Sequence, residues 1–188
     1  MLSSFIANLP NKQGSDYYIG IQASASSFSS ASPEQIIIPG FRLSIYPNPE
    51  YNLWAQMGKW PGSQPEFSVG TGIQVSFPGE NTQYGQTLGA TWNKIFGTDY
   101  SQRDISIHGI YTRYSSPWDF GLMAIYTMHH VLVENAANFQ DFDRTQLFLV
   151  PYFSWTFGDV MRLTASVPFN TQGAALSADI EWFVGQRE

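Results

Sequence analysis

Apolar and polar residues alternate along most of the chain, and this period of two constrains the fold more than any other feature. In residues 67–77 the odd positions read Phe, Val, Thr, Ile, Val and Phe, while the even positions read Ser, Gly, Gly, Gln and Ser. Residues 119–127 and 145–157 repeat the pattern. Because successive side chains of a β-strand point to opposite faces, the alternation predicts strands with one apolar and one polar face.

The length of the alternating segments indicates what kind of sheet they form. Roughly ten segments follow one another, and most have about ten residues, the length that a tilted strand needs to cross a bilayer. Strands of soluble sheets are shorter, with about five or six residues. The chain has no run of about 18 consecutive apolar residues, so no transmembrane helix is predicted. The expected fold class is therefore all-β: a closed antiparallel transmembrane β-barrel of about 10 strands, within a range of roughly 8–12.

The composition of the polar face favours lipid over water outside this barrel. It consists mainly of Gly, Ser, Thr, Gln and Asn, and only 13% of all residues are charged, against about 25% in soluble domains. A soluble sandwich, or a soluble carrier of apolar ligands, would need a charged outer face. The aromatic share of 16% also suits the interfacial girdles of membrane barrels.

Charge and cysteine content exclude other classes. The net charge is −6 and there is no Lys/Arg-rich run, so we expect no nucleic-acid partner. Without cysteine there is no disulfide bond or Cys-based metal site, and we expect no cofactor, no metal and no catalytic residue. The first residues lack the pattern of a signal peptide, so we interpret the chain as the mature protein. We expect an N-terminal extension over residues 1–15 and a single barrel domain over residues 16–188.

Short and long connections alternate along the predicted strand order. Residues 47–50 and 115–118 read as tight turns, whereas residues 129–144 are predicted to be the longest loop. Short turns on one side and longer loops on the other are typical of outer-membrane barrels. We expect four charged residues of the long loop to contact a solute, lipopolysaccharide or a partner: Glu134, Asp141, Asp143 and Arg144.

As an architecture, most of the chain resembles the bacterial outer-membrane β-barrels, including the small porin-like ones. Residues 176–184 are similar to the C-terminal assembly signal of that superfamily, which alternates apolar residues and finishes with an aromatic one. The chain departs from it, because Gly185-Gln186-Arg187-Glu188 follow. The resemblance implies the bacterial outer membrane as location and its lipid as partner. It carries no functional motif and leaves the oligomeric state open.

The alternation also places a few charged and bulky side chains inside the predicted barrel. We expect Arg162 to pair with acidic residues of the last strand in an internal network that braces the lumen. The alternative is that these charges are unrelated and lie near the rims. The predicted lumen-lining set is Arg42, His108, Arg162, Asp179 and Glu181, and the predicted constriction is formed by Tyr18, Trp54, Phe148 and Tyr152.

Three functions are compatible with such a barrel. The first is a narrow channel for small solutes or ions. The second is a non-conducting structural or adhesion barrel that acts through its extracellular loops. The third is an outer-membrane lipid-modifying hydrolase, in which Ser106 and His108 would act with a carboxylate. The Ser-x-His spacing is also simply that of same-face neighbours on a strand, so we regard an enzyme as the less favoured hypothesis.

Overall fold

The computed structural model describes most of the chain as strands. No described residue lies in a helix long and apolar enough to cross a membrane. For residues 18–28 and 36–40 and at several strand ends, the description is confined to the backbone. The described residues are 18–28, 36–48, 50–60, 66–78, 83–97, 100–115, 117–135, 138–158, 160–171 and 173–184.

All strands of the described residues belong to one antiparallel sheet, in which β1 to β8 pair in sequence order and both β9 and β10 lie between β8 and β11. This up-and-down order follows from the sequence, because alternating side chains form the strands and Gly, Pro or Asn residues form the connections between them. The strands are β1 (Tyr18–Phe28), β2 (Ile36–Asn48), β3 (Tyr51–Trp60), β4 (Glu66–Pro78), β5 (Tyr84–Phe96), β6 (Tyr100–Ser115), β7 (Trp118–Asn135), β8 (Asn138–Phe157), β9 (Met161–Ser166), β10 (Phe169–Asn170) and β11 (Gly173–Val184).

The sheet closes into a barrel, because β1 pairs with both β2 and β11. β9 and β10 are two parts of one barrel strand: Ser166 lies opposite Tyr152 and Phe169 opposite Leu149, in one continuous register along β8. Pro168 separates the two parts, since it has no N–H to donate to the ladder. The described residues therefore form ten barrel strands, and the predicted closed antiparallel barrel is confirmed.

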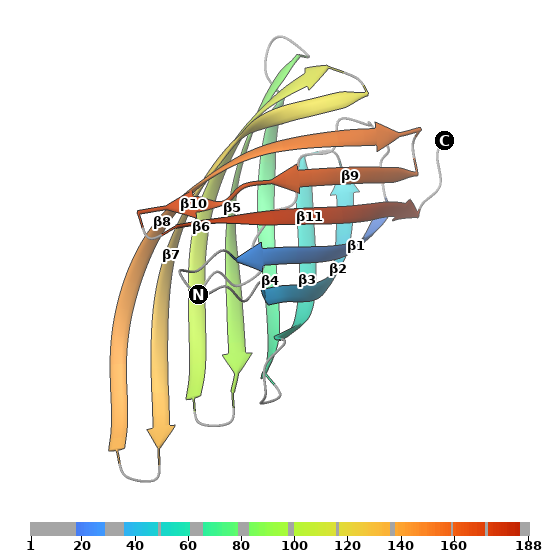
Figure 1. Cartoon of the computed structure of the whole chain (residues 1–188). Coiled ribbons are helices and arrows are strands. Elements are labelled where there is room, and N and C mark those ends of the chain that lie inside the picture. The colour runs from blue at the N-terminus through green and yellow to red at the C-terminus, as the bar shows by residue number, and fades with distance from the viewer. Residues whose placement is uncertain are drawn as a thin grey trace.

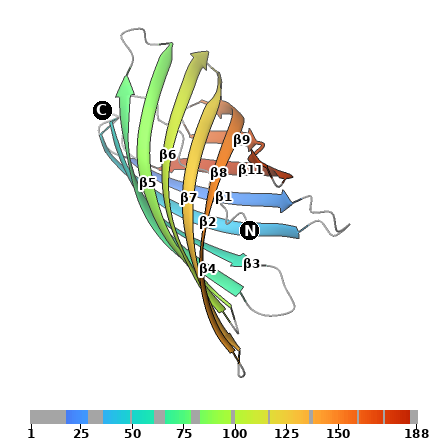
Figure 2. The ribbon, with the colours of Figure 1, turned by 90° about the vertical axis from the view of Figure 1, so that its left-hand side faces the viewer.

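The two ends of the barrel are defined by the connections. We call the end with the connections after β2, β4, β6 and β8 the turn end, and the opposite end the loop end. Following register partners once round the barrel from Thr156 leads back to β8 at Arg144, a stagger of 12 residues (156 minus 144). A staggered barrel has strands tilted by about 35–45°, which is why the strands of opposite walls cross in Figures 1 and 2.

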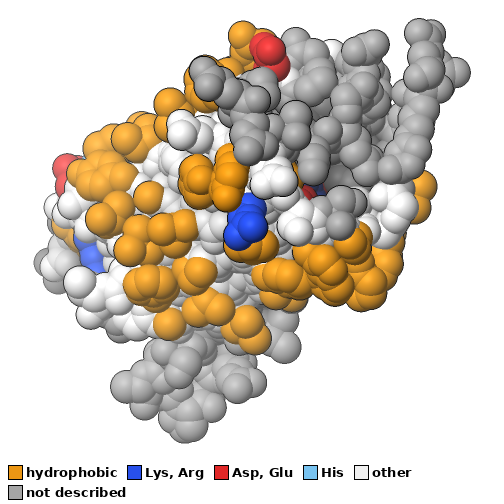
Figure 3. All heavy atoms as spheres, turned by 90° about the horizontal axis from the view of Figure 1, so that it is seen from above, with side chains coloured by type: hydrophobic (Ala, Val, Ile, Leu, Met, Phe, Trp, Pro, Cys, Tyr) orange, Lys and Arg blue, Asp and Glu red, His pale blue; other side chains and the backbone are white. Residues whose placement is uncertain are grey.

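Outward side chains are apolar and exposed, whereas inward side chains are buried. On β6, Ile105 and Ile107 are 50% and 57% exposed, but Ser106 and His108 only 1% and 5%. Hydrophobic side chains are spread over much of the described surface in Figure 3, with few charges among them. A soluble protein would not expose so much apolar surface, so lipid is the medium that this exterior fits.

The height of the apolar exterior matches a membrane. On β6 the outward face is apolar between Arg103 and Arg113, which are ten residues apart (113 minus 103). At about 3.3 Å per residue and a tilt of about 40°, this distance corresponds to a band about 25 Å tall, the usual height for an outer-membrane barrel. Lys94, Arg103, His130 and Asp143 are successive register partners across β5–β8 and mark its border at the loop end.

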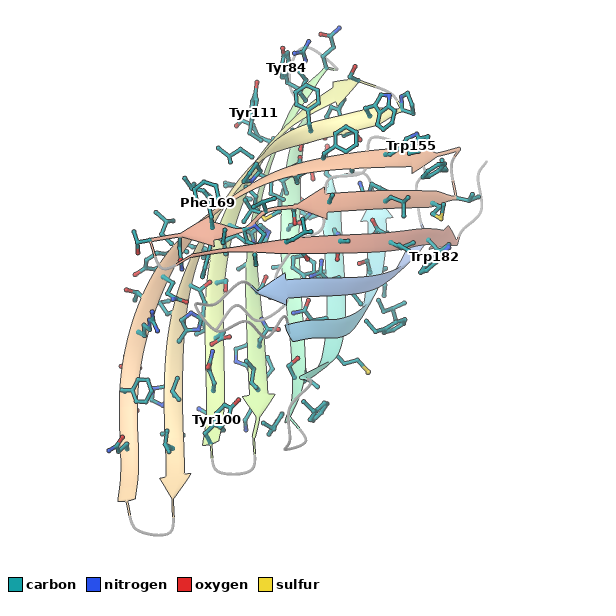
Figure 4. All side chains as sticks on the ribbon, viewed as in Figure 1. Tyr84, Tyr100, Tyr111, Trp155, Phe169 and Trp182 are labelled. Atoms are coloured by element: carbon teal, nitrogen blue, oxygen red, sulfur yellow. The ribbon has the colours of Figure 1, made fainter. Side chains whose placement is uncertain are left out.

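Aromatic side chains stack near both borders of this band. Near the turn end, Trp118 stacks on Trp155 with ring centroids 4.7 Å apart, and Tyr84 on Tyr111 at 5.8 Å. At the loop end, Phe67 stacks on Phe96 with ring centroids 5.4 Å apart, and Figure 4 shows Tyr84 and Tyr111 near the opposite end of the barrel. Such positions suit aromatic rings that anchor a barrel at the lipid–water interface.

The predicted long loop over residues 129–144 is wrong. These residues continue β7 and β8, with Val131 opposite Phe142 and Val133 opposite Gln140, and only residues 136–137 connect the two strands. β-Branched and aromatic cross-strand pairs stabilise the ladder to its end, although the local composition looks loop-like. The β7–β8 hairpin, with strands of 18 and 20 residues, reaches beyond its neighbours at the loop end (Figure 1).

Candidate functional site in the barrel lumen

Charged and amide side chains follow one another along a single inward register row, which we call the polar row. The row takes one position from each strand in turn, so it winds through the lumen from near the turn end to the loop end. The position on β4 is Gly70, and that on β1 is Gln22, whose side chain lies outside the described residues. Parity along one strand shows which face a residue lies on, but only the register places these residues side by side. The members with described side chains are Arg162, Glu181, Arg42, Gln56, Asn93, Asp104, His129 and Arg144.

Near the turn end, an ion pair joins β9 and β11. Arg162 donates through Nε to Glu181 Oε2 at 3.1 Å and also through Nη2. Both residues are only 4% exposed, as is Asp179, two positions before Glu181. A buried charge costs several kcal/mol unless it is paired, so each partner makes the other tolerable. That the pair braces the barrel stays a prediction.

The row continues through a hydrogen-bonded bridge across β4. Arg42 donates to Gln56 Oε1 through Nη2 at 2.8 Å, and Gln56 Nε2 donates to Asn93 Oδ1 at 2.7 Å. Gly70 lies between Gln56 and Asn93 in the register, and a Cβ at Gly70 would overlap the Asn93 carboxamide. The missing side chain therefore lets β3 and β5 bond directly across β4.

At the loop end, the row becomes a buried cluster around an imidazole. His129 Nδ1 lies 2.7 Å from Asp104 Oδ1, and its Nε2 lies 3.0 Å from Gln146 Oε1. Gln102 Nε2 donates to the same Asp104 oxygen at 2.7 Å. Asp104 is completely buried and His129 is 6% exposed. The hydrogen bonds on both ring nitrogens hold the imidazole in one orientation.

A pocket of about 320 Å³ opens above this cluster at the loop end. Three adjacent strands, β6, β7 and β8, supply all of its lining, and every lining residue has inward parity. Its floor is polar and its walls are aromatic, with Arg144 on one side. The lining residues are Tyr100, Gln102, His129, Val131, Phe142, Arg144 and Gln146.

The middle of the β6–β8 wall is apolar instead. Its side chains are 0–4% exposed, and one polar atom, the Tyr152 hydroxyl, is satisfied by Thr112 Oγ1 at 2.5 Å. Trp54 on β3 is equally buried at 3%. The predicted constriction residues Trp54, Phe148 and Tyr152 thus all point inward, whereas the side chain of Tyr18 lies outside the described residues. The apolar cluster consists of Ile110, Met123, Ile125, Phe148, Val150 and Tyr152.

The two residues of the hydrolase hypothesis are not joined to each other. Ser106 shares its hydrogen bond with Thr127 at 2.9 Å. The Nε2 of His108 is buried without a hydrogen-bond partner in the described part of the chain. Its ring lies over Gly89, where a Cβ would overlap it. The geometry provides no nucleophile and base at these positions.

Several other buried polar groups near His108 also lack a partner among the described residues. Both side-chain atoms of Asn52 and Gln74, which face each other across β3 and β4, are unbonded, as is Trp54 Nε1. Asn52 and Gln74 are 2% and 1% exposed. Buried polar groups are normally bonded to protein or water, so this part of the lumen has the chemistry to hold ordered water.

The predicted loop-contact residues lie on both faces of the extended hairpin. Asp141 and Asp143 point outward beside His130, whose Nδ1 lies 3.5 and 2.8 Å from their Oδ1 atoms. The ligand atoms of these three residues lie within 4.8 Å of one another, which is close enough to hold a cation. Arg144 points into the pocket, and the side chain of Glu134 lies outside the described residues.

Sequence reasoning missed the centre of the loop-end cluster. The alternation of residues 119–127, continued to His129, predicts an inward side chain, but the predicted loop over residues 129–144 separates His129 from Asp104 and the two glutamines. The only signal that unites them is the cross-strand register of β6, β7 and β8, in which Asp104 lies opposite His129. A register cannot be read from one strand alone.

The fold is that of the bacterial outer-membrane β-barrels. No protein-family model matches the chain, and no curated protein matches it. Among solved structures, it is similar to the translocator domain of the autotransporter NalP from Neisseria meningitidis, with a TM-score of 0.50 and 9% identity, covering 94% of this chain and 90% of that one. At this identity the similarity shows the fold alone.

Two other solved structures are also similar to this chain. The KdgM porin has a TM-score of 0.48 and 8% identity, covering 88% of this chain and 99% of that one. Neisserial surface protein A has a TM-score of 0.45 and 13% identity, covering 90% and 98%.

Proposed function

We propose that this chain is a barrel of the bacterial outer membrane that acts through its loop end, with a lumen filled by side chains. The observation that carries this proposal is the burial of the inward side chains in the middle of the β6–β8 wall, where Met123 and Val150 are not exposed at all. Side chains just fill the interior of an eight-stranded barrel, and in this wider ten-stranded one large inward side chains such as Phe148 and Tyr152 take up the additional width. The lipid of the outer membrane, with lipopolysaccharide at the loop end, would be the surrounding partner.

The extended strands support the second half of the proposal. β7 and β8 continue beyond the apolar band, and Gln140 to Thr145 are exposed whichever way they point. A continuously paired hairpin that projects from the membrane suits a binding surface, because binding residues lie on elements that the scaffold positions.

Planar-bilayer recording of the full chain tests the filled lumen. We expect no steady unitary current from the wild type. Phe148→Ala, which removes a large inward ring, is the opening variant, and Leu149→Ala, one residue along on the lipid side, is its matched control. Steady single-channel steps from the wild type would overturn the proposal.

A narrow channel for small solutes or ions remains the second candidate, and the unpartnered groups of Asn52, Gln74 and His108 favour it. Water bonded to these groups would provide a path between strands β3 and β6. In that case the wild type conducts, and Gln74→Leu lowers the unitary current because it removes a polar lining group without enlarging the side chain. The absence of current in both proteins would count against the channel.

A further inference from the structure

The pocket at the loop end has the composition of a ligand site. We infer that it binds a small organic anion that carries an aromatic ring, such as a benzoate-type carboxylate. This deepens the proposed function, because it assigns a ligand class to the loop end on which that proposal rests. The volume of the pocket, about 320 Å³, lies at the lower end of the range for small-molecule pockets.

The cationic side of the pocket selects the charge of the ligand. Arg144 is exposed and points inward, directly opposite His129 in the register. The nearby carboxylates of Asp141 and Asp143 have the opposite parity and lie on the outer face with His130. The carboxylate inside, Asp104, is already bonded to His129 and Gln102. The guanidinium of Arg144 is thus placed to bind an anion with two parallel hydrogen bonds.

The walls select a ring. Phe142 is 48% exposed although it points inward, and Tyr100 lines the same space from β6. Val131, the register partner of Phe142, covers the surface between them. An aromatic ring of a ligand would bury these faces and gain both apolar area and ring stacking.

The floor fixes the shape of the site before a ligand arrives. Gln102, His129 and Gln146 are only 5–8% exposed. Asp104 joins Gln102 to His129 by hydrogen bonds of 2.7 Å, and His129 Nε2 lies 3.0 Å from Gln146 Oε1. These polar groups cannot turn without breaking buried hydrogen bonds. A preorganised floor lowers the entropy lost on binding.

Fluorine NMR of the full chain in lipid nanodiscs tests this inference, with empty nanodiscs as the blank. Three probes separate the contributions: 4-fluorobenzoate carries ring and charge, 4-fluorobenzyl alcohol only the ring, and trifluoroacetate only the charge. We expect 4-fluorobenzoate to bind roughly tenfold or more tightly than either of the others. Equal binding of 4-fluorobenzoate and trifluoroacetate would overturn the proposed class, as would equal binding of 4-fluorobenzoate and the alcohol.

Two substitutions of the same type locate the site. Arg144→Gln should weaken 4-fluorobenzoate about tenfold and leave 4-fluorobenzyl alcohol unchanged. Arg103→Gln removes the same charge at the same end of the barrel but on the outer face. It should change the affinity for neither 4-fluorobenzoate nor 4-fluorobenzyl alcohol. If both variants lose the same affinity for 4-fluorobenzoate, anions are attracted to the barrel rim in general, and the proposed site is wrong. Because this measures binding and not current, it is independent of the conductance test.

Discussion

The wall formed by β6–β8 and the wall formed by β9 and β11 fill the same lumen with opposite chemistry. The first contributes an apolar cluster around Met123 and Val150, and the second contributes the ion pair of Arg162 with Glu181. Both sets of side chains are almost fully buried. In the apolar wall stability depends on filled volume, whereas in the ionic wall it depends on each charge keeping its partner.

The difference also explains how a chain with few charges can use them inside. The outer face meets lipid, so it holds apolar residues and keeps its charges at the borders of the band. The inner face can accept charge only where a neighbouring strand supplies the partner, as Glu181 does for Arg162. The polar row therefore depends on register more than on composition.

The largest effect is expected from breaking the ion pair. Arg162→Met leaves the buried Glu181 carboxylate without its cation and should lower the free energy of unfolding by about 3–5 kcal/mol. Urea unfolding in lipid vesicles, followed by Trp fluorescence, measures this change.

The double variant Arg162→Met, Glu181→Gln is the control for this experiment. It removes both charges and should recover part of the loss, since no unpaired ion remains. If the single variant unfolds at the same urea concentration as the wild type, the ionic wall contributes nothing and the contrast between the two walls disappears.

The apolar wall should respond to lost volume. Met123→Ala leaves a cavity among Ile110, Val150 and their neighbours, and should cost about 2–5 kcal/mol. Leu122→Ala, one position earlier, removes a similar volume from the lipid-facing side, where lipid chains can fill the space. Leu122→Ala should therefore lower the free energy of unfolding clearly less than Met123→Ala does in the same experiment. Equal costs would mean that the lumen is not packed at Met123.

Much of the fold follows from sequence patterns, but the site does not. Alternation placed Arg42, His108 and Arg162 on the inward face, where the structure has them buried. It failed over residues 129–144, because charged and Asn residues near the hairpin tip resemble a loop while their pairing depends on the opposite strand. Parity determines the face of a residue, but its neighbours in the lumen depend on the stagger of all ten strands.

The smallest effect concerns the glycines that make room in the lumen. The ring of Trp54 lies over Gly72, and a Cβ added there would overlap it. Gly72→Ala should therefore cost about 1–3 kcal/mol, the usual cost of overpacking a filled interior. The temperature at which the unboiled protein loses its folded gel mobility gives a first measure, and urea unfolding gives the free energy.

Gly109→Ala is the matched comparison, because its added Cβ would meet only Leu88 Cδ2, at an ordinary contact distance of 3.6 Å. Gly109 lies on the outer face of β6, where alanine restricts the unfolded chain without a clash, so a gain of about 0.5–1 kcal/mol is expected. If Gly72→Ala lowers the free energy of unfolding and Gly109→Ala raises it, the packed side of the sheet lies inside the barrel. If Gly109→Ala lowers the stability and Gly72→Ala does not, that assignment is reversed. The distinction between a filled lumen and a lipid-facing exterior would then be wrong as well.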